Sequence, residues 1–117
     1  MNTEVIDVEG LKRLSGNDAG FVSEILKLYT ERTAKDIEEL EASRLIKDWG
    51  GVRFVVHRMR SAAVPLGLKN LVVQLRKVEN QLKDEDLKGI EKQLDEIVAG
   101  AEYALQDAHQ KLKLATV

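Results

Sequence analysis

A long amphipathic segment near the C-terminus, residues 84–112, reads DEDLKGIEKQLDEIVAGAEYALQDAHQKL. Its apolar residues recur at intervals of three and four, the spacing that places side chains on one face of an α-helix. Asp84 follows a polar break and can serve as the N-cap. The pattern therefore predicts a long helix that buries one apolar seam, formed by Leu87, Ile90, Leu94, Ile97, Ala101, Leu105, Ala108 and Leu112.

The same spacing predicts four more helices upstream, and no alternation of period two indicates a strand. The expected ranges are 8–14 with Asp7 as N-cap, 17 or 18 to 43, 49–64 with Asp48 as N-cap, and 68 or 69 to 82. Pro65 and Gly67 should end or kink the third of these. Four long helices with short connections predict an all-α fold: an antiparallel up-and-down four-helix bundle with a short N-terminal capping helix.

Composition narrows the function classes. With 117 residues, 44% of them hydrophobic and 32% charged, we expect one domain that spans residues 1–117. Cysteine is absent, which excludes disulfides, thiolate metal sites and a cysteine nucleophile. No long apolar run or basic-then-apolar start is present, so we expect a cytoplasmic protein without membrane insertion. The net charge of −2 argues against nucleic-acid binding.

His57 is the strongest functional candidate because its helix points it away from the apolar seam. If Val52, Val55, Met59, Ala62 and Leu66 form that seam, His57 lies roughly 170° from it at about 100° per residue. The residues within one turn of it include Arg53, Arg60 and Ser61 but no carboxylate. We therefore expect an exposed ring in a basic surrounding, with no acid to orient it, offering a neutral nitrogen to an anionic partner.

The middle of the chain is basic. Asp48 is the only acidic residue from position 47 to 77, a stretch that also contains Arg53, Arg58, Arg60, Lys69, Arg76 and Lys77. This distribution predicts a positive surface or, equally, an ordinary solvated helix face. Phe21 and Leu28 flank the apolar stripe of the preceding helix, where they either widen the core or dock a partner.

Other site chemistries lack the residues they need. Only two histidines are present, His57 and His109, and neither has a carboxylate three or four positions away, so a metal site is not expected. Ser61 could be a nucleophile with His57 as its base, but no third residue nearby orients the imidazole, so we do not expect a hydrolase. Gly50 and Gly51 are not followed by the lysine of a phosphate-binding loop, so we expect no ATP site.

Residues 48–67 resemble the active helix of histidine-containing phosphotransfer (HPt) domains. That family shows a histidine followed by an apolar residue at the second position, lysine at the third, glycine at the fourth and glycine at the tenth. Met59 and Gly67 match, Arg60 replaces the lysine with another cation, and Ser61 replaces the first glycine. The similarity extends to residues 17–21 upstream and to Leu71, Leu75 and Glu79 downstream.

The resemblance implies a phosphorelay intermediate. His57 would accept a phosphoryl group from the aspartyl phosphate of one receiver domain and pass it to another, with Arg60 neutralising the phosphate. Arg53, Ser61 and Val64 would belong to the docking footprint. No cofactor would be bound by this chain, and Mg²⁺ would sit on the receiver. The same reading implies a monomer that carries phosphate without being an enzyme.

Two alternatives remain open from the sequence. One is a helical-bundle adaptor that binds partners without carrying phosphate. The other is a coiled-coil interaction module, because the seam of residues 87–112 extends over several turns.

Overall fold

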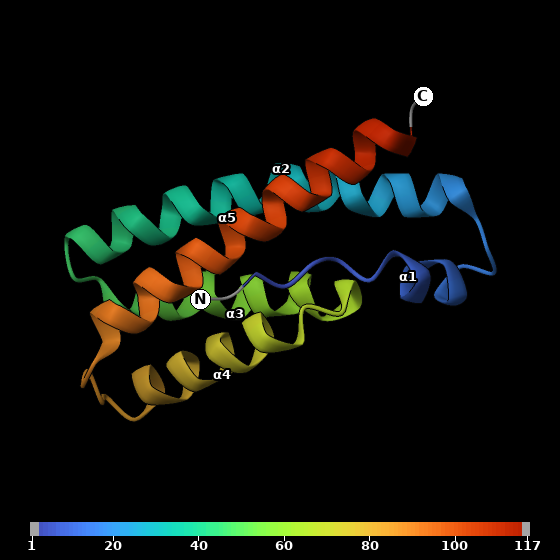
Figure 1. Cartoon of the computed structure of the whole chain (residues 1–117). Helices are drawn as coiled ribbons and strands as arrows, with labels where there is room; N and C mark the ends of the chain where they lie inside the picture. The colour runs from blue at the N-terminus through green and yellow to red at the C-terminus, as the bar shows by residue number, and fades with distance from the viewer. Residues whose placement is uncertain (1–2, 116–117) are drawn as a thin grey trace.

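The computed structural model describes residues 3–115 and contains no strand within them, which confirms the all-α class (Figure 1). The predicted domain of residues 1–117 thus ends outside the described residues on both sides. No helix in the described part is long and apolar enough to cross a membrane. The elements are α1 (Val8–Leu14), α2 (Ala19–Leu45), α3 (Trp49–Ala63), a 3₁₀ turn η1 (Val64–Leu66), α4 (Lys69–Lys83) and α5 (Ile90–Ala115).

The four long helices share one hydrophobic core. α2 packs against α3 and α5, and α4 packs against the same two helices, while α1 contacts α2 and η1 at one end (Figure 1). The molecule measures 44 × 23 × 21 Å, and its longest dimension is about the length of the 27-residue helix α2. Its most deeply buried side chains come from all four long helices and include Leu26, Leu40, Val52, Val56, Leu75, Leu94 and Ile97.

Aspartate caps fix three of the helix starts, and two of these caps, Asp7 and Asp48, are predicted by the sequence. The carboxylate of Asp7 accepts a hydrogen bond from the Gly10 amide at 2.9 Å, and that of Asp48 accepts one from Gly51 at 3.0 Å. Asp18 caps α2 in the same way. Each bond satisfies an amide that the helix itself leaves unpaired. The prediction for the start of the last helix was wrong.

Asp84 is the C-cap of α4, and α5 begins only at Ile90. Glu85 and Gly89 adopt φ angles of 57° and 70°, left-handed conformations that interrupt a helix. Leu87 consequently lies outside the seam and is 44% exposed. The apolar spacing could not show that α5 begins at Ile90. Leu87 lies three residues before Ile90, as in a helix, but the backbone between them turns.

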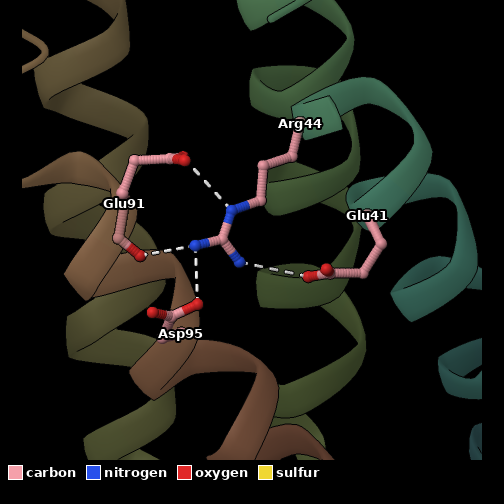
Figure 2. A network of polar contacts seen from close by, with 4 residues as sticks. All are labelled: Glu41, Arg44, Glu91 and Asp95. Carbon is pink, nitrogen blue, oxygen red and sulfur yellow. Dashed lines mark hydrogen bonds and ion pairs between the residues drawn. The ribbon is translucent and has the colours of Figure 1, made fainter. Parts of the chain in front are cut away.

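Arg44 joins the end of α2 to the start of α5 (Figure 2). Its guanidinium bonds to Asp95 at 2.6 Å, to the Glu91 carboxylate at 3.2 Å and to Glu41 at 3.2 Å. It also donates to the Glu91 carbonyl at 2.7 Å. Partial burial opposes the charge of Arg44, but the hydrogen bonds to Asp95 and Glu91 outweigh it and raise the pKa of Arg44. This network closes the bundle at the end opposite α1.

The N-terminal segment closes the other end. The Glu4 carboxylate accepts hydrogen bonds from the amides of Asn70 (3.0 Å) and Leu71 (3.2 Å), so it caps α4, whose own N-cap, Leu68, has no polar side chain. Ile6 is buried, and its amide donates to Asp107 of α5 at 2.9 Å. Residues 4–7 therefore link the starts of α1 and α4 to α5.

Candidate functional site

α3 presents His57 to solvent. Val52, Val55, Val56 and Met59 are buried in the core, so the opposite face of the helix is exposed, and the His57 side chain keeps 57% of its surface. The sequence prediction of an exposed ring is confirmed. The backbone around His57 is regular α-helix. It departs from α-helical geometry only after Ala63, in the 3₁₀ turn that contains Pro65 and at Gly67, whose φ is 70°.

A side chain at position 51 would force its neighbours at the start of α3 to shift. A Cβ atom on Gly51 would lie 2.6 Å from an Asp48 carboxylate oxygen and 2.9 Å from the Ser43 hydroxyl oxygen. These distances are too short for any real contact. Gly51 therefore allows the Asp48 cap and the packing of α3 on the end of α2, which together set the direction in which α3 carries His57.

Glu79 of α4 orients the ring. Its Oε1 lies 2.7 Å from His57 Nδ1, and its Oε2 accepts a hydrogen bond from Arg60 Nε at 2.9 Å. Partial burial opposes ionisation of Glu79, but the hydrogen bonds from Arg60 and His57 outweigh it, so the pKa of Glu79 lies below its usual value. The expectation that no carboxylate holds the ring was wrong, because the carboxylate comes from another helix.

The contact with Glu79 decides which nitrogen is free. An ionised carboxylate only accepts hydrogen bonds, so a 2.7 Å contact places the proton on His57 Nδ1. Arg60 Nη2 lies 3.2 Å from the same atom, but two donors cannot bond to each other, and we assign that proximity to the shared carboxylate. In the neutral ring, His57 Nε2 is then the nitrogen without a proton, and its lone pair is available as a nucleophile.

Arg60 is 24% exposed at its side chain and is paired with Glu79, so it is not a free surface cation. Only its Nε takes part in the hydrogen bond to the carboxylate, and a guanidinium has five N–H donors. One of the remaining donors, Nη2, lies 3.2 Å from His57 Nδ1, so the guanidinium is beside the imidazole. Arg60 can thus hold Glu79 and still contact an anion.

Arg58 points the other way, toward α2. Its guanidinium bonds to Asp36 at 2.7 Å and to Glu39, and it lies 5.5 Å from the centre of the Phe54 ring. Asp36 is only 4% exposed, and burial raises its pKa while the hydrogen bond from Arg58 partly offsets that effect. The predicted positive surface is therefore partly neutralised, since Arg58 and Arg60 are both paired.

The sequence contains a weak signal that Asp36 is a paired carboxylate. Asp36 falls on the buried stripe of α2, between Thr33 and Leu40, where an unpaired charge is rarely found. A charge at such a position needs a partner from a neighbouring helix. No spacing rule, however, names Arg58 as that partner.

The predicted docking residues lie around His57 on one face. Arg53 and His57 line an open groove of about 390 Å³ together with Phe54 and Glu79. Ser61 is exposed one turn beyond, and its hydroxyl donates to the His57 carbonyl at 3.3 Å. Val64 is 55% exposed at the end of this face. His109 is also exposed, on α5, and residues 3–115 contain no group of three acidic or histidine side chains placed to hold a metal.

The family model of the Hpt domain matches residues 24–115. This match covers most of the chain, so the protein belongs to the Hpt domain family. No curated protein and no solved structure shows significant similarity to it. Hpt domains are phosphocarrier modules of two-component phosphorelays that interact with receiver domains, and they are not enzymes with ATP sites.

Proposed function

We propose that His57 is the phosphorylated residue and that this chain relays a phosphoryl group between two receiver domains. Nε2 would attack the phosphorus of a receiver's aspartyl phosphate. A nitrogen–phosphorus bond forms, the acyl phosphate P–O bond breaks, and the receiver's aspartate leaves as a carboxylate. The second transfer runs in reverse toward another receiver's aspartate. The observation that carries the proposal is the exposed His57 side chain, whose Nδ1 contacts Glu79 at 2.7 Å and whose Nε2 would then be the nucleophile.

Glu79 and Arg60 have complementary roles in this proposal. Attack through Nε2 leaves a positive charge on the ring, because Nδ1 keeps its proton, and the Glu79 carboxylate stabilises that charge. The free donors of Arg60 stabilise the phosphoryl oxygens. The receiver would supply Mg²⁺ and its own carboxylates, so this chain needs to provide only positioning and charge compensation. Arg53, Ser61 and Val64 would contact the receiver.

The arrangement of the helices supports the same proposal. We infer an antiparallel up-and-down bundle of α2 to α5 with α1 as its cap, acting as one domain over residues 1–117 in the cytoplasm. In support, each long helix contacts the next one along the chain, and α5 also packs against α2. We also expect a monomer, because Leu94, Ile97 and Ala101 of the α5 seam are already buried within the chain. This burial disfavours the coiled-coil alternative.

The direct test is phosphoryl uptake from a phosphorylated receiver. Wild-type protein should take up label that is labile in acid and stable in alkali, and His57→Gln should take up none. Equal labelling of the two proteins would remove His57 from the proposal. Binding of receivers without any labelling would support the adaptor alternative instead. Sedimentation would separately test the monomer.

A further inference from the structure

A second groove lies next to the candidate transfer site, between α2 and the end of α3. It encloses about 200 Å³ and is lined on the α2 side by Ile25, Leu28 and Tyr29. Ala62 and Pro65 line the opposite side. Ser61 borders it one helical turn from His57, so the groove is continuous with the face that carries the imidazole. A receiver domain that docks on this face would also cover the groove.

The groove is largely apolar but carries one exposed cation, Arg32. Within residues 3–115, no carboxylate lies within ion-pair distance of the Arg32 guanidinium. Its electrostatic partner is the buried Asp36, whose hydrogen bonds go to Arg58. The two arginines of α3 nearest His57 on the sequence, Arg58 and Arg60, are both paired with carboxylates. Arg32 thus differs from them in having its charge available.

Leu28 shows that this face is not simply core. Its side chain is 41% exposed at the groove, and Phe21, two turns earlier on the same flank of α2, is 42% exposed. An exposed apolar strip that ends at an arginine without an ion pair suits a partner surface with an apolar ridge and an acidic residue at its edge. A neutral or basic residue at that edge would leave Arg32 desolvated without a partner, which costs binding energy.

We propose that Arg32 selects among receiver domains by pairing with a carboxylate on the receiver surface that covers this groove. The inference rests on the proposed function of His57. Arg32 contacts neither the phosphoryl group nor the imidazole, so it acts on recognition and not on the chemical step. Its removal should therefore change the receiver concentration needed for half-maximal transfer, while the rate at saturation stays nearly constant.

The test uses the receiver that phosphorylates the wild-type chain fastest in a panel, with the receiver first phosphorylated by acetyl phosphate and Mg²⁺. Arg32→Glu should raise the half-saturating receiver concentration about tenfold, because attraction becomes repulsion, and change the saturating rate less than twofold. Arg32→Ala should have a smaller effect in the same direction. Lys27→Glu is the matched control, since Lys27 is also exposed on α2 but about 140° around the helix.

Reversal of the matching acidic residue on the receiver to lysine should restore transfer to Arg32→Glu, which identifies the pair. If Arg32→Glu and Lys27→Glu behave alike, the proposal for Arg32 is overturned while the role of His57 stands. If the wild type takes label from no receiver, or His57→Gln takes as much label as the wild type, the proposed function fails and the inference about Arg32 falls with it.

Discussion

Replacement of Glu79 by alanine tests the central link between the fold and the chemistry. The substitution removes the acceptor 2.7 Å from His57 Nδ1 and the partner of Arg60 at 2.9 Å. A hydrogen bond to a charged group contributes about 1.5–3 kcal/mol when it is buried. The His57 side chain is 57% exposed, so solvent reduces its share to about 1 kcal/mol. One kcal/mol corresponds to roughly a fivefold change in an equilibrium.

We therefore expect Glu79→Ala to lower the ratio of the Nδ1-protonated tautomer to the Nε2-protonated one by about fivefold, since the carboxylate favours the first. Phosphoryl uptake should slow by about five- to tenfold, because the ring also loses its orientation. The tautomers can be read from two-bond ¹H–¹⁵N correlations at alkaline pH, where an ordinary imidazole is neutral. Rapid-quench labelling with a saturating phosphorylated receiver measures the rate.

Asn80→Ala is the matched control, because Asn80 is the exposed neighbour on α4 and its side chain makes no hydrogen bond to His57, Arg60 or Glu79. Circular dichroism should show the same helix content in both variants. An unchanged tautomer ratio in Glu79→Ala would refute the assignment of the proton to Nδ1. An unchanged transfer rate with a changed ratio would show that orientation by Glu79 does not limit the chemistry.

The remaining predictions concern the neighbouring charges and the core. Arg60→Ala should shorten the lifetime of the phosphorylated protein and slow transfer while the fold is kept; equal lifetimes would exclude Arg60 from phosphate stabilisation. Because folding lowers the pKa of Glu79, its ionised form contributes stability at pH values above the ordinary carboxylate pKa, and this contribution disappears as pH falls through the lowered value. The melting temperature of Glu79→Gln should therefore lie below that of the wild type near neutral pH and converge with it in acid; a constant difference would contradict this. Asp36→Ala should destabilise the fold by about 1–3 kcal/mol in urea, since it leaves Arg58 with Glu39 as its remaining carboxylate partner, and an effect below about 0.5 kcal/mol would show that the pair is energetically neutral. Leu94→Ala should cost about 2–5 kcal/mol, because Leu94 is fully buried between helices, and no loss of stability would mean that α5 is not packed as described.

Local patterns determined most of the helical structure. Apolar spacing of three and four residues predicted all five α-helices, and the predicted caps Asp7 and Asp48 bond the amides expected of them. The same spacing placed His57 on the exposed face of α3. These features depend on residues within about one helical turn, where the backbone geometry is already known from the sequence. The start of α5 was misplaced because a left-handed turn at Glu85 and Gly89 leaves no trace in apolar spacing.

The tertiary structure alone decided how His57 and its neighbouring arginines are paired. Glu79 lies 22 residues from His57, and Asp36 lies 22 residues from Arg58, so each pair meets only because two helices pack side by side. Which carboxylate reaches which cation depends on the rotation and offset of the helices, and these are set by the core. The amino-acid sequence by itself determined that an exposed histidine exists, whereas helix packing decided which of its nitrogens is free to react.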